Sequence, residues 1–361
     1  MKQVRAPKQT ACRWVATGKA LRNAAAWLPW AVGMALWFGG ATPALAEECD
    51  TEKTCVAQLT YGETNAHREL AARFLGERGN PAVLPALIIA LEKDLGEFVR
   101  VRAAEAMGLI GDKQGIPPLV KAMREDKRSP VRAAAAISLG LIGEKAGVEN
   151  LVLALNGDDS WEVRRAAAVA LSRFKDDDLA LAALIVRLAD DPREEVRRHI
   201  ARSLGVLGKA TAAEPLGKAL LAEASPEVRR EVAIALGTTP GDNAREFLMK
   251  AMREEQDRVV RRQVVHTLGV RGEKSAVSGL IAALRGDPAI EVRQEAASSL
   301  GRIGGPMAKD ALHYYAANSI FPRIKNAAQD ALDELPPPSG EKEAEGEKGE
   351  EEKGKQEEST G

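Results

Sequence analysis

The stretch VRRHIARSLGVLG at residues 196–208 recurs along the chain with small changes, as VRRQVVHTLGVRG at 260–272 and VRQEAASSLGRIG at 292–304. A motif that returns at a fixed spacing is typical of a repeat protein, in which each unit packs against its neighbours instead of around one central core. The spacing of this stretch therefore decides the fold class.

The recurring element is a Val-Arg anchor pair, or a close substitute for it. A small residue, mostly Ala, follows the first anchor residue by five positions, and Leu or Met follows it by eight. Positions zero, four, five and eight share one face of an α-helix, so each anchor belongs to an apolar helix face. Successive anchors are 32, 32, 32, 33, 32, 32, 32 and 32 residues apart, and they begin at His67, Val99, Val131, Val163, Val196, Val228, Val260, Val292 and Ile324.

Each anchor helix is preceded by a second predicted helix. Its apolar pair stands twelve and eight residues before the anchor, as Leu151 and Leu155 do. Glycines nine and twelve residues after the anchor, such as Gly140 and Gly143, end the anchor helix and permit close packing. The aromatic content of 4% also favours helix packing by Ala, Leu, Val and Ile. Residues 47–335 are therefore predicted to form an all-α solenoid of about nine 32-residue helical hairpins.

The pattern is interrupted once and altered at both ends. LSRFKDDD at residues 171–178 lacks the glycines and contains the single step of 33 residues, which predicts a local insertion. His67 and Cys55 in the first unit, and Ile324 and Ala316 in the last, replace the usual residues. Terminal repeats are commonly atypical because they lack one neighbour.

The repeat resembles the short HEAT-like repeat of the phycobilin-lyase type, whose pattern is an acid-Pro turn followed by V-R-x-x-A-A-x-A-L-G-x-I-G. Residues 131–143 and 292–304 match this pattern closely, and the resemblance covers about residues 52–335. It implies a HEAT-like α-solenoid. Repeats of this kind occur in bilin lyases, assembly factors and binding scaffolds, so the resemblance specifies the fold far more narrowly than the function.

The first 46 residues have a different composition. Six basic residues and no acidic ones accompany the apolar run AAAWLPWAVGMALWFGG, and ATPALA follows it. This order is typical of a secretory signal peptide and predicts cleavage after Ala46, which would leave a periplasmic or secreted protein without membrane contact. The alternative is an uncleaved N-terminal anchor, because the apolar run approaches the length of a membrane-spanning helix.

The other end of the chain is strongly acidic. Residues 336–361 hold nine Glu and four Lys, and no apolar residue larger than Ala follows the prolines. Such a segment cannot bury a core and is predicted to be a disordered Glu/Lys-rich tail. Without its first 46 residues the chain has 45 basic and 52 acidic residues. This balance disfavours nucleic acid as a partner.

Two cysteines remain after the predicted cleavage site. Cys49 and Cys55 are six residues apart, and an oxidising compartment would allow a disulfide between them. The alternative is that Cys55 is a buried apolar residue, because it occupies an apolar position of the repeat.

Arginines form two periodic sets. The anchor arginines lie within reach of the acid in the turn of each hairpin, and we expect them to form a structural frame. Four consecutive units carry a further Arg two residues after the anchor, on the helix that lines the concave face in similar proteins. We expect either a stripe that binds acidic groups or solvated charges paired with acids such as Glu231 and Glu295. This set, called the arginine stripe below, is Arg165, Arg198, Arg230 and Arg262.

No catalytic, metal or cofactor site is predicted. The four histidines, His67, His199, His266 and His313, fall in different units and are expected to be surface or terminal polar residues. None is followed by Glu, so the His-Glu pairs of deoxyhypusine hydroxylase, a HEAT-like di-iron enzyme, are absent from the sequence.

The sequence thus favours a non-enzymatic scaffold that binds a protein or peptide, possibly an acidic one, on the concave face of the solenoid. The alternatives are a bilin-lyase-like enzyme or assembly factor, which the resemblance implies, and a structural spacer without a dedicated ligand.

Overall fold

The computed structural model describes residues 49–335, and within that range the chain forms nine helical hairpins. The first helices of the hairpins are α3 (Glu52–Tyr61), α5 (Leu84–Lys93), α7 (Ile116–Glu125), α9 (Val148–Gly157), α11 (Asp178–Asp190), α13 (Ala213–Ala222), α15 (Asp242–Glu254), α17 (Val277–Gly286) and α19 (Pro306–Asn318). The second helices are α4 (Asn65–Arg78), α6 (Glu97–Ile110), α8 (Ser129–Ile142), α10 (Trp161–Leu171), α12 (Glu194–Leu207), α14 (Pro226–Thr238), α16 (Arg258–Val270), α18 (Ile290–Ile303) and α20 (Pro322–Asp333). The predicted all-α solenoid is confirmed.

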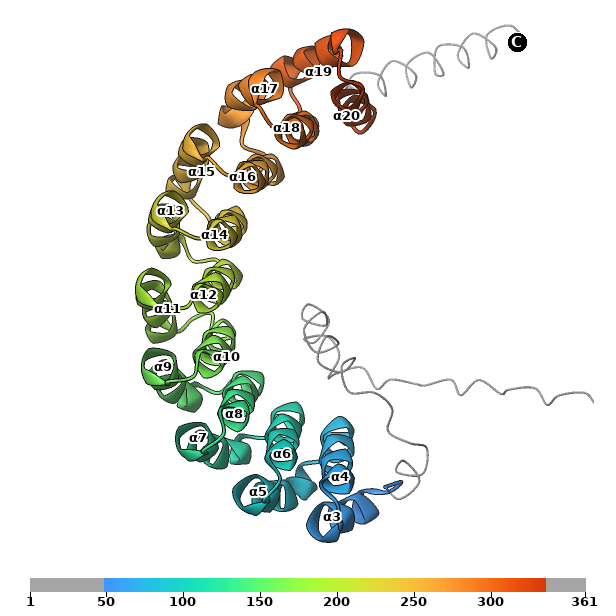
Figure 1. Ribbon diagram of the computed structural model, residues 1–361, viewed down its shortest axis with the longest axis vertical. Helices are drawn as coiled ribbons and strands as arrows, with labels where there is room; N and C mark the ends of the chain where they lie inside the picture. Colours follow the sequence, from blue (N-terminus) through green and yellow to red (C-terminus); the bar gives the residue numbers. More distant parts are fainter. Residues whose placement is uncertain (1–48, 336–361) are drawn as a thin grey trace, which may run out of the picture.

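The hairpins stack into an open arc with two rows of helices (Figure 1). The first helices form the outer, convex row, and the second helices, which carry the anchors, form the inner row. Successive second helices contact each other along the whole row. The concave face is therefore built from the anchor helices.

Short 3-10 turns lead into five of the outer helices. They are η1 (Pro81–Val83), η2 (Lys113–Gly115), η3 (Lys145–Gly147), η4 (Ala210–Ala212) and η5 (Lys274–Ala276). They precede α5, α7, α9, α13 and α17, and each of them follows an anchor helix that carries both glycines of the repeat.

The core is a continuous apolar layer between the two rows. Anchor residues such as Val131 and Val228 are fully buried, and so are Leu139 and Leu236 eight residues later. Burying one such side chain contributes roughly 1.5–3 kcal/mol, and each helix buries only a few of them. A single hairpin would expose much of this surface, so each unit depends on its neighbours.

The two glycines of the repeat have different roles. A Cβ atom on Gly140 would lie 2.8 Å from the Cα of Ala170 in the next anchor helix, and Gly205 meets Ala235 at the same distance. These glycines allow neighbouring inner helices to approach closely. Gly143, three residues after Gly140, has a φ of 74° and ends α8 in the left-handed conformation that favours glycine.

The interruption predicted at residues 171–178 lies in the middle of the arc. Helix α10 ends at Leu171 after 11 residues, whereas α8 and α12 have 14. Ser172 takes the place of the close-contact glycine, and its hydroxyl donates a hydrogen bond to the Val169 carbonyl oxygen at 2.7 Å. The turn between α10 and α11 contains this interruption, including the one extra residue of the unit.

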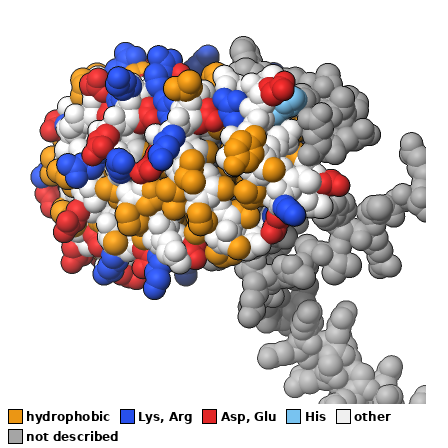
Figure 2. Space-filling view, turned by 90° about the horizontal axis from the view of Figure 1, so that it is seen from below, with side chains coloured by type: hydrophobic (Ala, Val, Ile, Leu, Met, Phe, Trp, Pro, Cys, Tyr) orange, Lys and Arg blue, Asp and Glu red, His pale blue; other side chains and the backbone are white. Residues whose placement is uncertain are grey.

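The N-terminal end of the stack has no preceding unit among the described residues. Figure 2 views the N-terminal units from below, and on this side hydrophobic side chains form a band bordered by Lys, Arg, Asp and Glu. Tyr61 and Ile89 are among the exposed apolar residues of α3 and α5. Close by in sequence, Cys49 and Cys55 form a disulfide with their Cα atoms 4.8 Å apart, and both residues are buried. Cys55 thus also fills the apolar position that the repeat assigns to it.

The predicted signal peptide at 1–46, its cleavage after Ala46 and the predicted disordered tail at 336–361 lie outside the described residues. Within residues 49–335, every helix is too short or too polar to cross a membrane.

Candidate functional site

A ladder of arginine–carboxylate pairs joins consecutive units. Arg100 illustrates it: its Nε and Nη2 donate to the two carboxylate oxygens of Asp126 in the next unit, at 2.8 and 3.1 Å. Its Nη1 donates to the Asp94 carbonyl oxygen of its own hairpin turn at 2.9 Å. Seven such pairs occur between residues 49 and 335, and they are Arg68–Asp94, Arg100–Asp126, Arg132–Asp158, Arg164–Asp191, Arg197–Glu223, Arg229–Glu255 and Arg261–Asp287.

Each ladder acid also holds its own turn. The Asp191 carboxylate accepts a hydrogen bond from the Arg193 backbone N–H at 3.0 Å, in addition to those from Arg164 and Arg187. Burial alone would raise the pKa of Asp191, but these hydrogen bonds outweigh it and lower the pKa. The frame therefore keeps Asp191 ionised, and the seven arginines of the ladder are occupied in it.

The ladder does not connect the eighth and ninth units, because the ninth unit lacks the acid in its turn. Ser319 stands at the acid position of the ninth unit. Arg293 instead donates to the Leu284 carbonyl oxygen at 2.9 Å, and its guanidinium carbon lies 4.9 Å from the centre of the Phe321 ring. The last unit is thus attached without a carboxylate rung.

The arginine stripe lies on the inner row, on α10, α12, α14 and α16. Its first member, Arg165, is half-buried, and its guanidinium carbon lies 5.4 Å from the centre of the Trp161 ring. Arg193 lies over the same ring at 5.7 Å. Burial, together with repulsion from Arg198, lowers the pKa of Arg165 even though Glu162 opposes the shift. Trp161 and two arginines thus form one edge of the stripe.

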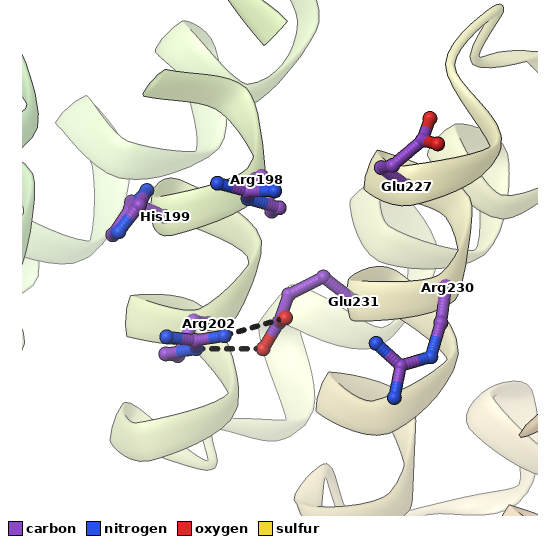
Figure 3. Close-up of a pocket in the computed structure, with 6 residues that line it drawn as sticks. All are labelled: Arg198, His199, Arg202, Glu227, Arg230 and Glu231. Atoms are coloured by element: carbon purple, nitrogen blue, oxygen red, sulfur yellow. Dashed lines mark hydrogen bonds and ion pairs between the residues drawn. The ribbon is translucent and has the colours of Figure 1, made fainter. Parts of the chain in front are cut away.

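The two middle members line a pocket of about 350 Å³ between α12 and α14 (Figure 3). Arg198 is half-buried and Arg230 is exposed. Among the described residues, neither guanidinium has an ion pair or a hydrogen bond. The residues that line the pocket are Arg198, His199, Arg202, Glu227, Arg230 and Glu231.

Glu231, one of the two acids that line the pocket, is paired with a different arginine. Arg202 donates from Nε and Nη2 to the two carboxylate oxygens of Glu231, both at 2.8 Å, and the Glu231 side chain is only 7% exposed (Figure 3). Glu227 accepts a hydrogen bond from the Ser225 hydroxyl at 3.1 Å. The expectation that Glu231 would neutralise a stripe arginine is therefore not met, because Arg202, one turn further along α12, occupies it.

The last member of the stripe belongs to another cluster. Arg262 lies 3.5 Å from a carboxylate oxygen of Glu295, which also contacts His266 and Arg302 at 2.9 and 3.2 Å. The alternative expectation, that a stripe arginine pairs with Glu295, is therefore met by Arg262. The stripe thus divides into a stacked Arg165, a paired Arg262, and Arg198 and Arg230 between them.

His199 departs from the expected surface position. It is 4% exposed, and its Nδ1 lies 2.7 Å from the Glu195 carbonyl oxygen, one turn earlier on α12. Burial first, and then repulsion from the neighbouring arginines Arg165, Arg202 and Arg198, lower its pKa to about 4. His199 is therefore neutral at physiological pH, mainly because it is buried, and the neighbouring arginines add to the shift. In sequence the position holds Ala in two preceding units, and nothing there distinguishes a buried histidine from an exposed one.

Within the described part of the chain, His, Cys, Asp and Glu side chains form no group of three that could hold a metal ion. The histidines lie in separate units, as the repeat register predicted.

Solved structures resemble the chain in fold at low sequence identity. Kap95p, whose binding induces the switch loops of RanGDP to adopt the GTP-bound conformation, has a TM-score of 0.58 and 13% identity, over 79% of this chain and 44% of that one. Kap121p bound to RanGTP has a TM-score of 0.57 and 13% identity, over 81% and 38%. The chain therefore spans less than half of either structure. The CpcE–CpcF complex of phycocyanin lyase from Nostoc sp. PCC7120 matches at 24% identity over 42% and 96%, with a TM-score of 0.37.

A sequence comparison with curated proteins finds no match. The HEAT repeats family, in contrast, matches four overlapping segments, at residues 53–140, 116–194, 181–269 and 245–333. Together they span the stacked hairpins without a gap. The Val-Arg anchor, the glycine pair and the two-row arc thus have one common explanation, and the chain belongs to the HEAT repeats family.

Proposed function

We propose that this chain is an exported, non-enzymatic scaffold whose concave face binds an acidic segment of a partner protein. The observation that carries the proposal is the pair Arg198 and Arg230, two guanidinium groups on neighbouring inner helices that line one pocket without a carboxylate partner in the described chain. Guanidinium groups match carboxylates through paired hydrogen bonds, which favours acidic ligands over other anions of less suitable shape.

The spacing of the inner helices suits an extended segment. Packed helices lie roughly 8–10 Å apart, and an extended chain advances about 3.3 Å per residue. A segment that crosses the inner row would therefore meet one unit about every three residues. Acidic residues at that interval would reach Arg198 and Arg230 in turn.

The neighbouring part of the inner row is apolar. Phe98 and Leu141 are exposed, and Val101 and Ile137 are half-buried, at positions of α6 and α8 that share the helix face of the stripe. We infer that the partner carries apolar side chains beside its acidic segment. Affinity would then come from many modest contacts, with the charges selecting the partner.

Solved structures of similar fold support a protein as the ligand, since Kap121p is seen bound to RanGTP. The order of basic residues, apolar run and small residues in 1–46 supports export to the periplasm or the medium.

The proposal is tested with a fluorescein-labelled peptide of twelve glutamates, whose binding is followed by fluorescence anisotropy. The chain's own residues 341–358 are acidic, so binding is measured in a variant with its nine tail glutamates changed to glutamine. Adding Arg198→Gln and Arg230→Gln should weaken binding about tenfold, since two exposed or half-buried ion pairs together contribute on the order of 1.4 kcal/mol.

The control changes Arg124 and Arg253, exposed arginines of the outer helices α7 and α15, to glutamine. It removes the same charge and should leave the affinity unchanged. Equal weakening by both pairs would show that only net charge matters, and would reject a site on the concave face.

A further inference from the structure

We propose that the acidic residues 341–358 of this same chain occupy Arg198 and Arg230 when no partner is bound, so that the tail acts as a built-in competitor. This inference rests on the proposed function, because it uses the same two arginines. It makes partner binding a displacement reaction. Only a ligand that offers more than negative charge would then be retained.

The tail can pair with the charged part of the concave face but cannot cover its apolar part. Residues 341–358 contain nine Glu and four Lys, and their only apolar residue is Ala344. Such a segment can supply carboxylates to the arginines but has nothing to cover Phe98, Ile137 and Leu141. The apolar part of the face would remain open to a partner while the tail is bound.

Carboxylates elsewhere in residues 49–335 leave the two arginines available. Glu195 and Glu227 precede Arg198 and Arg230 by three residues on the same helices, yet they form no ion pair with them in the described structure. Glu231 is held by Arg202. The lowered pKa of His199, to which three arginines contribute after burial, reflects the positive surrounding that remains. An added carboxylate would therefore be attracted to the pocket.

The tail is long enough to reach the pocket. The described chain leaves the solenoid after α20, the last helix of the inner row (Figure 1). Helix α12 lies four helices back along that row, about 30–40 Å at the usual packing distance. Glu350 is fifteen residues beyond Leu335 and can extend to about 50 Å.

A tethered ligand also competes efficiently. A tether of this length gives an effective concentration on the order of 1 mM. If the tail segment binds with a Kd of about 0.1 mM, the tethered tail weakens binding of a free competitor about tenfold. Even if the free tail peptide binds weakly, the tethered tail would therefore occupy the pocket in most molecules of the whole chain.

The experiment uses a fluorescein-labelled peptide of residues 341–358, EKEAEGEKGEEEKGKQEE, added to the full chain. Four forms are compared: the unchanged chain, the tail variant with nine tail glutamates as glutamine, the tail variant with Arg198→Gln and Arg230→Gln, and the tail variant with Arg124→Gln and Arg253→Gln. We expect the tail variant to bind the peptide about tenfold more tightly than the unchanged chain. The arginine changes should abolish this gain, whereas Arg124→Gln with Arg253→Gln should preserve it.

Equal affinity of the unchanged chain and the tail variant would overturn the inference, and so would a gain that survives the loss of both arginines. The oligoglutamate probe separates this failure from that of the proposed function. If it binds the unchanged chain and the tail variant equally, and loses affinity on arginine replacement, the scaffold site stands and the tail is not its occupant. If neither probe responds to the arginines in any form, both proposals are rejected.

A second readout is the titration of His199 by NMR. Bound tail carboxylates would offset the repulsion from the surrounding arginines, so the pKa of His199 should be higher in the unchanged chain than in the tail variant. An identical pKa in both forms would contradict occupation of the pocket by the tail.

Discussion

His199 is buried beside three arginines, and its pKa lies near 4 instead of 6.5. Between these two values the unfolded chain binds a proton at this side chain and the folded chain does not. The contribution of His199 to stability is therefore complete above about pH 6.5 and is lost as the pH falls toward 4.

His199→Gln should remove this dependence. The drop in pKa from 6.5 to about 4 corresponds to at most about 3 kcal/mol of unfolding free energy. Urea denaturation at several pH values should show the difference between the unchanged chain and the variant growing from pH 4 to pH 6.5 and then levelling off. Parallel pH profiles for the two proteins would show that His199 titrates normally in the folded state.

Gly140 tests the close approach of the inner helices. Gly140→Ala would place a methyl group 2.8 Å from the Cα of Ala170, and the backbone of α10 cannot turn away as a flexible side chain could. We expect a loss of about 1–3 kcal/mol in unfolding free energy, measured by urea denaturation. Gly157, the last residue of α9, has open space around its Cβ position and provides the matched control. Similar effects of Gly140→Ala and Gly157→Ala would contradict the packing argument.

Two recurring structural features join the hairpins: the apolar layer between the two rows of helices and the arginine ladder between consecutive units. Each ladder arginine binds the turn of its own unit and the carboxylate of the next, so it fixes the angle at which one hairpin meets another. Regular repetition of that angle produces the regular arc. The irregular unit at α10 keeps its rung, Arg164–Asp191, although its glycine contact is lost.

Arg229→Ala should be strongly destabilising, because it leaves the Glu255 side chain, 5% exposed, without its arginine. Loss of one partner from a buried pair costs about 3 kcal/mol. The double variant Arg229→Met, Glu255→Met removes both charges and should recover most of this loss. Thermal or urea unfolding measures both. Equal destabilisation by the single and the double variant would mean that the side-chain volume, and not the uncompensated charge, is what matters.

The whole molecule is a linear stack, so its stability is expected to vary along the arc. The last unit lacks the carboxylate rung, because Ser319 replaces the acid and Arg293 turns to Leu284 and Phe321. Units held on one side only, and without a rung, should open more readily than central ones. The arc is thus expected to fray from its C-terminal end.

Ser319→Asp should add an eighth rung. The Ser319 hydroxyl oxygen already accepts a hydrogen bond from the Phe321 backbone N–H at 3.3 Å, the same contact that the ladder acids make with their turns. Hydrogen–deuterium exchange of α19 and α20 should slow severalfold, and exchange of α12 should not change. The effect should vanish in a chain that also carries Arg293→Gln. Slower exchange that persists without Arg293 would assign the gain to the turn alone.

The sequence by itself determined the fold, its period and the ladder residues, because these depend on positions that recur in every unit. Nine anchors, the glycine pair and the turn acids are each repeated often enough that local exceptions do not hide them. The sequence also reveals the periodic arginine stripe, but it does not reveal which acids pair with each of its arginines. Whether Arg262 meets Glu295, whether Arg202 or Arg230 takes Glu231, and whether His199 is buried depend on side chains that face each other from different units. Those contacts form only when neighbouring helices stack at a particular angle, and so the tertiary structure alone decided which arginines remain available.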